Sequence, residues 1–581
     1  MNRIFKTKWS DSHKQYVVTD ENHSNKGKTA KSAVTMAVSA LMLVAGAASA
    51  TYMEPGFKAQ DAAQMGQAKT SWETAEYQKN WGLSALKAST AYALGFHAQS
   101  VKVGMMDSGI LTTHKELSGD RWHMVAASGE FTHDGERYPQ YAYGRTPQDT
   151  GKYKKGDKFT VDGAYKAGVN DNHGTGCAGV YAGNRDGSGM HGVAWGSDFY
   201  SANTGGSDDM NYGPFPDYGF FKAGYDALVN SGVKIINNSF GTNLKQVDER
   251  GNIVYYYYSG PELTTVHDIE YEYFLFKKQY NEGPSFVDAA WDAVKGKDVI
   301  QVFTNGNNDR ANPYHRALYP YFNPEAEAQW IAIAGLKQVD SLNAPSNYKL
   351  EVKFNEAGYA KYWTLVGPGQ NGNTANIAGD DKYGRYGGTS MAAPFVSGAF
   401  AVLASRYQDM SALQVREVLL TTANHKNTDG TDMEGWANVS GDAPAEGEVS
   451  DRMGWGVPDL EKGMYGLGQL SGKFEYNLKA GNLDVWSNDI SQIALDQRAR
   501  EDLAWLKSAT EDGTTDGKVV VSNVLTDYKL TNTSTASANQ DGREHNYDLA
   551  GIKDKNISLE DANLQVVKRS LKAQKRSRHF S

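Results

Sequence analysis

The sequence predicts an α/β fold, in which helices flank a central, mostly parallel β-sheet. Segments with helical spacing alternate with short β-branched runs, in the order 220–229, 233–237, 286–294 and 298–303. A helix that joins two strands in this way forms a βαβ unit, so the strands run parallel. Two further apolar runs, 330–335 and 363–369, are predicted to extend the same sheet.

Length and composition set the outer limits. The chain has 581 residues, of which 40% are hydrophobic and 22% charged, as in ordinary globular proteins. This length accommodates one large domain and an appendage. The formal net charge of −9 argues against nucleic acid as a partner. The single cysteine excludes an intramolecular disulfide, so stability must come from the core or from bound ions.

The first 50 residues are organised as an export signal. Lysines precede an apolar segment, 33–48, and the motif Ala48-Ser49-Ala50 is typical of signal-peptide cleavage sites. We therefore predict a signal peptide that is removed after Ala50. A membrane anchor is the competing interpretation, which the shortness of the apolar run disfavours. Residues 51–70 are polar and rich in Ala and Gln, and are predicted to form a linker.

Ser390 is the first candidate for chemistry. It follows a Gly-Gly-Thr turn and precedes an apolar run of small residues, 392–407, which predicts a buried helix. At a helix start, unpaired backbone N–H groups and the helix dipole can stabilise an oxyanion beside the serine. Pro394 is expected in the first helical turn, where its missing N–H is not needed. The alternative is that Ser390 serves only as the helix N-cap.

A serine nucleophile needs a base and a carboxylate that orients the base. Residues 101–109 predict a buried strand that ends in Asp107 and a Gly turn. His173 is predicted to open a helix whose glycines indicate close packing against a neighbour. Cys177 comes four residues later, on the same helix face, and is interpreted as a small buried hydrophobic residue.

The order of these three motifs, with their flanking residues, resembles the subtilisin-like serine proteases, or subtilases. The resemblance runs from about Trp72 to Leu470 and implies the three-layer subtilisin-like fold. It implies that Asp107 orients the base, that His173 is the general base and acid, and that Ser390 is the nucleophile. No HExxH motif occurs and no GxSxG motif surrounds Ser390, which disfavours zinc proteases and α/β-hydrolases.

The resemblance also indicates an oxyanion donor and a substrate pocket. In the run Thr304-Asn305-Gly306-Asn307-Asn308, it makes Asn307 the side-chain amide that stabilises the oxyanion, while Asn305 and Asn308 remain competing candidates. In subtilases, the residues that follow the strand corresponding to 233–237 line the primary specificity pocket. The resemblance therefore makes Ser239, Phe240 and Gly241 the expected pocket residues.

The predicted function is that of a secreted serine endopeptidase, which hydrolyses protein or peptide substrates through an acyl-enzyme. The alternative is a catalytically inactive surface or adhesion module that retains the fold, because fold alone does not establish activity. All four chemical positions are filled, which favours the enzyme. The chemistry requires no cofactor and no catalytic metal. Subtilases often bind structural calcium, but no ligand set with a recognisable spacing occurs, so calcium is left unassigned.

The domain organisation follows from these segments. We predict a signal region at 1–50, a linker at 51–70, a catalytic domain at 71–470 and a small, polar C-terminal extension at 471–581. The extension ends in a basic tail, 568–581, with six Lys/Arg and no acid, which is predicted to be disordered. The long leader resembles that of Gram-negative autotransporters and two-partner exoproteins. It implies export through the periplasm to the cell surface or medium, either as part of a truncated autotransporter or with a separate outer-membrane export partner.

Overall fold

The computed structural model describes residues 56–465, with gaps at 61–62, 138–151, 207–211, 214–215, 242–244, 248–252, 256–268, 271, 274–275, 278–279, 341–346, 371 and 446, and outside this range residues 5–10, 15–20, 473–478, 482–487, 497, 501, 518–521 and 528–531. The predicted cleavage segment and the basic tail lie outside the described residues. The chain divides into two compact units, Met1–Met53 and Glu54–Ser581. In the first unit, β1 (Phe5–Ser10) pairs antiparallel with β2 (Gln15–Asp20).

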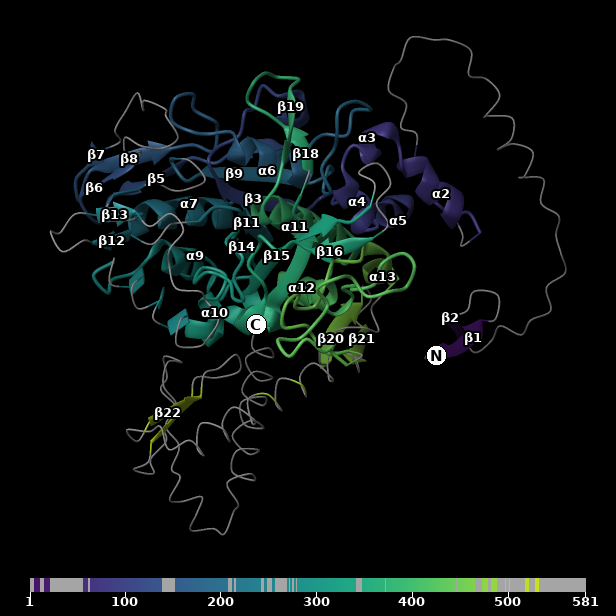
Figure 1. Cartoon of the computed structure of the whole chain (residues 1–581). Helices are drawn as coiled ribbons and strands as arrows, with labels where there is room; N and C mark the ends of the chain where they lie inside the picture. Colours follow the sequence, from purple (N-terminus) through teal and green to yellow (C-terminus); the bar gives the residue numbers. More distant parts are fainter. Residues whose placement is uncertain are drawn as a thin grey trace. The chain divides into compact units, whose positions relative to one another are not determined.

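A mostly parallel sheet forms the centre of the second unit (Figure 1). Its strands lie in the order β16-β15-β14-β11-β3-β9-β4, and β17 also pairs with β15. The bounds are β3 Lys102–Asp107, β4 Trp122–Met124, β9 Asp198–Asn203, β11 Ile235–Asn238, β14 Ile300–Thr304, β15 Trp330–Gln338, β16 Tyr348–Leu350 and β17 Thr364–Pro368. Only the β15–β16 pair of this sheet is antiparallel. The predicted parallel sheet is therefore confirmed.

Two hydrophobic cores cover the two faces of the sheet. Successive strand residues alternate between them, because side chains of a strand point to opposite faces: Met105 and Ile235 belong to one core, Met106 and Ile236 to the other. Helices α6 (His173–Ala182), α11 (Thr389–Arg406) and α12 (Ala412–Thr421) pack in the first core. Helices α7 (Tyr218–Asn230) and α9 (Phe286–Val294) pack in the second. This arrangement confirms the predicted three-layer α/β fold.

Three short helices follow one another over residues 73–96. They are α3 (Ala75–Gln78), α4 (Trp81–Ala85) and α5 (Ala88–Ala93), although the apolar residues of this segment have the spacing of one or two longer helices. The left-handed conformation of Lys87, with φ of 54°, separates α4 from α5. Helix α2 (Met65–Trp72) begins within the segment predicted as a linker and packs against α5.

Short elements complete the described structure. Small antiparallel sheets pair β5 (Ala127–Glu130) with β8 (Lys158–Val161), β6 (Gly135–Arg137) with β7 (Lys152–Tyr153) and β10 (Tyr212–Gly213), and β12 (Lys245–Val247) with β13 (Ile253–Tyr255). Others pair β18 (Gly372–Ala375) with β19 (Tyr383–Tyr386), β20 (Lys473–Leu478) with β21 (Asn482–Ser487), and β22 (Lys518–Val521) with β23 (Tyr528–Thr531). Further helical elements are α10 (Tyr319–Phe322), α13 (Leu460–Tyr465) and the 3₁₀ turns η1 (Lys115–Leu117), η2 (Pro324–Gln329) and η3 (Gly358–Trp363).

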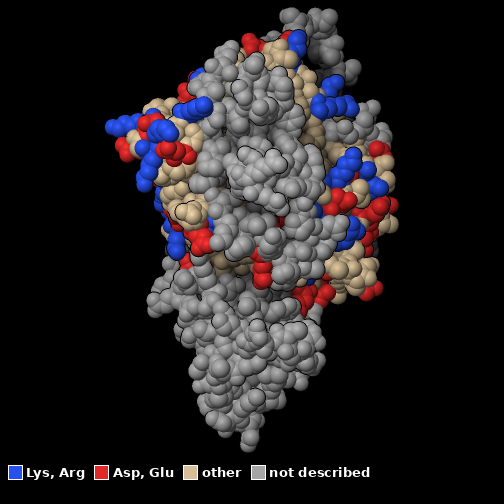
Figure 2. All heavy atoms as spheres, turned by 60° about the vertical axis from the view of Figure 1, so that its left-hand side comes forward, with Lys and Arg blue, Asp and Glu red and all other residues tan. Residues whose placement is uncertain are grey.

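Charge on the described surface is mixed. Figure 2 shows Lys and Arg side chains beside Asp and Glu side chains on the face it presents. Among the described residues, no helix combines the length and the apolar character needed to cross a bilayer.

Candidate active site

Asp107 lies at the carboxyl end of β3, between the neighbouring strands β9 and β11. Its carboxylate is fully buried, and its Oδ1 accepts a hydrogen bond of 2.7 Å from the backbone N–H of Ser108. The Ser108 hydroxyl in turn donates to Asp171 and accepts from the N–H of Gly174 at the start of α6. These bonds join the end of β3 to the start of α6, so they fix the carboxylate relative to that helix.

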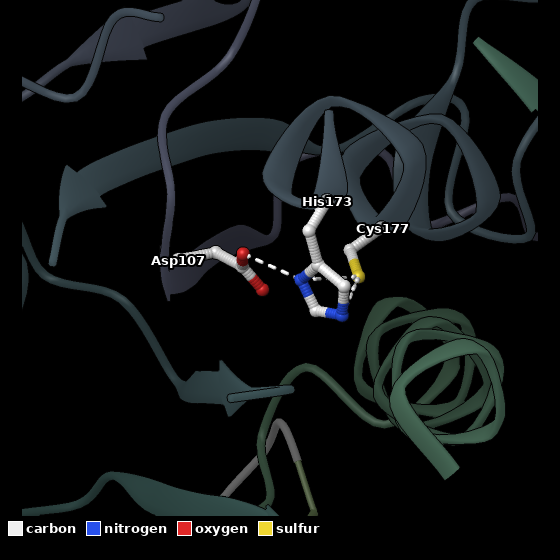
Figure 3. Close-up of side chains that lie close together, drawn as sticks. All are labelled: Asp107, His173 and Cys177. Atoms are coloured by element: carbon white, nitrogen blue, oxygen red, sulfur yellow. Dashed lines mark hydrogen bonds and ion pairs between the residues drawn. The ribbon is translucent and has the colours of Figure 1, made fainter. Parts of the chain in front are cut away.

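His173 is the first residue of α6, and its ring lies against Asp107 (Figure 3). The distance between His173 Nδ1 and Asp107 Oδ1 is 2.8 Å, and the histidine side chain is 13% exposed. The helix approaches the β3 turn so closely that a Cβ on Gly174 would lie 2.6 Å from the carbonyl oxygen of Gly109. Glycine is therefore required at 174, which confirms the predicted close packing of this helix.

Cys177 lies one turn further along α6 and is fully buried. Its Sγ is 3.7 Å from Nδ1 and 4.0 Å from Nε2 of His173 (Figure 3). The same sulfur lies 3.4 Å from the backbone carbonyl oxygen of Ser390. Burial raises the pKa of this thiol to about 11, so at neutral pH it is a protonated, uncharged group. Cys177 thus connects the histidine to the start of α11.

Ser390 is the second residue of α11, as the sequence predicts for a helix start. The N-cap position is held by Gly388, with φ of 124° and no capping side chain. The Ser390 hydroxyl instead donates a hydrogen bond of 2.8 Å to the carbonyl oxygen of Ser239, at the end of β11. The alternative in which Ser390 is only an N-cap is therefore wrong, because its hydroxyl points across to a different strand.

Pro394 does not lie in the first turn of α11, where the sequence analysis expects it. The helix begins at Thr389, so Pro394 stands in the second turn, inside the helix. A proline there leaves the carbonyl four residues earlier without its helical donor, and that carbonyl belongs to Ser390. The hydroxyl of Ser239 and the thiol of Cys177 supply hydrogen bonds to this oxygen, at 2.9 Å and 3.4 Å. The local cost of the proline is thereby offset.

The three candidate asparagines have separate surroundings. Asn305 is buried and its amide donates to the carbonyl of Glu356, while the Oδ1 of Asn308 accepts from the Tyr314 hydroxyl. Asn307 is exposed, and its Oδ1 accepts from both the N–H and the hydroxyl of Thr389, at 2.8 Å and 2.9 Å. Of the three, it is Asn307 whose amide is held against the residue before Ser390.

The orientation of Asn307 follows from these bonds. With Oδ1 held by Thr389, the Nδ2 group is the end of the amide that can donate elsewhere. A Cβ built on Gly388 would lie 3.2 Å from Asn307 Nδ2 and 3.6 Å from the backbone N of Ser390. Asn307 Nδ2 and the backbone nitrogen of Ser390 therefore both lie near the position that Gly388 leaves without a side chain.

The predicted pocket residues follow β11. Ser239 contacts Ser390 through both its hydroxyl and its carbonyl. Phe240 is buried, and its ring packs in the core against Phe221, Phe286 and Phe303, so only its backbone can face a substrate. Gly241 lies against the guanidinium of Arg316, a residue that no sequence motif singles out.

The described residues contain one group of three side chains close enough to share a metal ion, and it consists of Asp107, His173 and Cys177. Their ligand atoms lie within 4.8 Å of one another. Because these residues form the candidate triad and its neighbour, the group does not identify a calcium site. Structural calcium stays an expectation.

The described site has an Asp–His pair and a helix-start serine at the carboxyl edge of a parallel sheet, which defines an α/β protein of the serine-hydrolase type. The chain belongs to the Subtilase family, whose model matches residues 98–456. Residues 1–50 match the Extended Signal Peptide of Type V secretion system. This match confirms the predicted extended signal, and the protein is secreted or displayed on the surface of a Gram-negative cell.

Several known proteins are similar to this chain. An extracellular serine protease of Serratia marcescens is 27% identical over 497 residues, which cover 76% of this chain and 42% of the relative. The Neisserial autotransporter lipoprotein NalP of Neisseria meningitidis serogroup B is 28% identical over 290 residues, 45% of this chain and 23% of that protein. Fervidolysin from Fervidobacterium pennivorans, a keratinolytic enzyme related to subtilisin, has a crystal structure that aligns with this chain at 18% sequence identity and a TM-score of 0.42. The alignment covers 73% of this chain and 50% of the fervidolysin chain. The chain thus spans less than half the length of these two curated relatives.

Proposed function

We propose that this protein is a serine endopeptidase that hydrolyses peptide bonds in proteins or peptides through an acyl-enzyme. The observation that carries the proposal is the hydrogen bond of 2.8 Å between His173 Nδ1 and Asp107 Oδ1, with Cys177 joining that imidazole to the start of Ser390's helix. Membership of the Subtilase family and the similarity to extracellular serine proteases support the same assignment.

The reaction begins at the Ser390 hydroxyl. This group donates to Ser239 in the structure, so a rotation about its Cα–Cβ bond first turns it toward Nε2 of His173. His173 takes the hydroxyl proton while the oxygen attacks the scissile carbonyl carbon. Asp107 accepts from Nδ1–H, which holds the ring in the tautomer whose Nε2 carries the basic lone pair, and stabilises the imidazolium that forms.

The tetrahedral intermediate carries its negative charge on the former carbonyl oxygen. Asn307 Nδ2 and the backbone N–H of Ser390 border the space beside Gly388 and are the proposed donors to that oxygen. His173 then returns its proton to the leaving amine, which breaks the C–N bond and leaves an ester on Ser390. A water molecule, deprotonated by His173, hydrolyses the ester and restores the hydroxyl.

Hydrolysis of unfolded casein by the purified, exported protein tests this proposal. We expect wild-type protein to release peptides and Ser390→Ala to release none, while both melt at the same temperature. Ser405→Ala is the matched control, because it changes a serine in the last part of the same helix, where the hydroxyl donates to the Val402 carbonyl and accepts from the Ala98 N–H. Casein that stays intact with folded wild-type protein would favour the inactive surface module. Delivery across the outer membrane, by a partner or by a longer form of the chain, completes the proposed role.

A further inference from the structure

Two chain segments border Ser390, and they come from neighbouring strands. Residues 239–241 follow β11, and the Ser239 carbonyl accepts the Ser390 hydroxyl. Residues 305–307 follow β14, and Asn307 holds the turn before Ser390. Strands β11 and β14 are parallel neighbours in the sheet. Both segments therefore contact the turn that carries Ser390, where the proposed function places the bond to be cut.

Arg316 lies against the first of these segments. A Cβ placed on Gly241 would lie 2.8 Å from Cζ, 2.8 Å from Nη2 and 2.9 Å from Nη1 of Arg316. Three nearly equal distances mean that the flat face of the guanidinium covers the Gly241 backbone. The guanidinium occupies the space that any side chain at 241 would need.

Arg316 also approaches the second segment, through Tyr314. The Cζ of Arg316 is 5.2 Å from the centre of the Tyr314 ring. That ring packs on Gly306, where an added Cβ would lie 2.5 Å from ring atom Cδ2. Arg316 and Tyr314 thus link Gly241 to Gly306, the residue before Asn307.

The charge on Arg316 is not neutralised by a carboxylate within the described part of the chain. Its side chain is buried, with 6% exposure, and its Nε has no hydrogen-bond partner among the described residues. The nearby carboxylate of Glu272 is also buried, and lies 3.6 Å from Nη1 of Arg310 and 3.6 Å from Nδ1 of His315. Glu272 is thus engaged by a second arginine.

Glu272 faces more than one basic group. Burial lowers the pKa of His315, which leaves its imidazole neutral at pH 7, while the carboxylate of Glu272 interacts with Arg310 and also with Arg316. Burial lowers the pKa of Arg316 to about 10, so this guanidinium also keeps its charge at neutral pH. A buried, unpaired charge is costly, and an incoming carboxylate would remove that cost.

We propose that Arg316 is a specificity-determining residue, which selects substrates with a Glu or Asp side chain immediately before the scissile bond. A guanidinium presents parallel N–H donors that match a carboxylate, and such charge-assisted pairs are strong in surroundings that exclude water. The inference rests on the proposed function, because it assigns a substrate class to the same site.

Peptide p-nitroanilides that differ only in the residue before the cleaved bond test this inference. We expect the full-length, exported protein to cleave the Glu peptide with kcat/KM about 10- to 100-fold above that of its uncharged isostere Gln. The Arg316→Gln variant should lose most of this ratio, because its kcat/KM for the Glu peptide falls further than its kcat/KM for the Gln peptide. The Arg316→Lys variant keeps the positive charge but lacks the two parallel N–H donors of the guanidinium. It should therefore show a Glu/Gln ratio between those of wild type and Arg316→Gln.

Lys353→Gln is the control, because Lys353 is an exposed cation near the second segment, where its carbonyl accepts from the Asp309 N–H, and it does not contact Glu272 or Arg316 among the described interactions. We expect this variant to retain the Glu/Gln ratio. Equal cleavage of the Glu and Gln peptides by wild type would overturn the inference, as would an Arg316→Gln variant that loses all peptides equally, or a Lys353→Gln variant with the same loss of preference. If wild type cleaves no peptide and Ser390 is unreactive, the proposed function itself fails. Cleavage only after apolar or basic residues would leave that function standing and remove the role of Arg316.

Discussion

Substitutions of Asn307 should change turnover much more than stability, because its two polar side-chain atoms have different surroundings. Its Oδ1 is held by the N–H and hydroxyl of Thr389, while its Nδ2 borders the space next to Ser390 N–H. Asn307→Ala removes both atoms. Asn307→Asp keeps an acceptor for Thr389 but replaces the amide donor with a negative oxygen.

The expected magnitudes differ for the two properties. Loss of one oxyanion donor lowers kcat by about 10²–10³-fold, or about 2.7–4 kcal/mol of transition-state stabilisation. Loss of the two bonds to Thr389 removes about 0.5–1.5 kcal/mol each from the free energy of unfolding, at the lower end here because Asn307 is exposed. Asn307→Asp should therefore remain nearly as stable as wild type and lose at least as much turnover as Asn307→Ala.

Steady-state hydrolysis of a p-nitroanilide peptide, with urea unfolding of the same samples, measures both quantities. Asn308→Ala provides the control, because the side chain of Asn308 bonds Tyr314 and not the turn at Ser390. We expect its kcat to stay within a few-fold of wild type. A folded Asn307→Ala or Asn307→Asp variant with wild-type turnover would refute the assigned role, and so would an equal loss in Asn308→Ala.

Three further predictions use other described residues. A bulky organomercurial on Cys177 should displace the His173 ring and abolish hydrolysis. The Cys177→Ala variant should stay active and resist the reagent. Full activity of a protein whose thiol is fully modified would contradict the position of Cys177 beside His173. Burial raises the pKa of Glu116 from 4.5 to about 8, so its contribution to stability is fully present below pH 4.5 and is lost as the pH rises through 8. Relative to Glu116→Gln, wild type should therefore gain up to a few kcal/mol in the free energy of unfolding between pH 9 and pH 5, and parallel pH profiles of the two proteins would disprove it. Gly388→Ala should lower kcat by at least about 10²-fold, because its methyl group would lie near Asn307 Nδ2 and the Ser390 nitrogen and because alanine is strained at a φ of 124°. Unchanged kcat in the folded variant would show that this position is not the oxyanion site.

The sequence predicts the sheet and the helices that flank it because their signals are local. The β-branched runs before Asn238 and Thr304 form β11 and β14, and the apolar run after Ser390 forms α11. The start of α6 at His173 is also indicated by the small residues that follow it, although the partners of its glycines are distant in sequence: Gly174 packs on Gly109 and Gly179 on Thr374. These elements bring Asp107, His173 and Ser390 to one edge of the sheet, as their order in the chain indicates.

Other features depend on contacts between distant residues, which no local pattern encodes. The sequence suggests that Pro394 lies in the first turn of α11, but it lies in the second. This position is tolerated because the Ser239 hydroxyl and the Cys177 thiol donate hydrogen bonds to the Ser390 carbonyl, which loses its helical donor. Helices α4 and α5 are separate because Lys87 between them has a left-handed backbone conformation, which no glycine in the sequence signals. Arg316 carries no motif, and its place against Gly241 follows only from the packing of two loops.

Covalent labelling of Ser390 tests the central claim most directly. Folded, full-length protein is treated with a fluorophosphonate, and the adduct is located by peptide mass spectrometry, with His173→Ala and Asp107→Asn treated alongside. The geometry predicts a single adduct on Ser390 in wild type and labelling slowed by orders of magnitude in both variants. An unlabelled Ser390 in folded wild type, or labelling at the same rate in all three proteins, would contradict the claim that these residues act together.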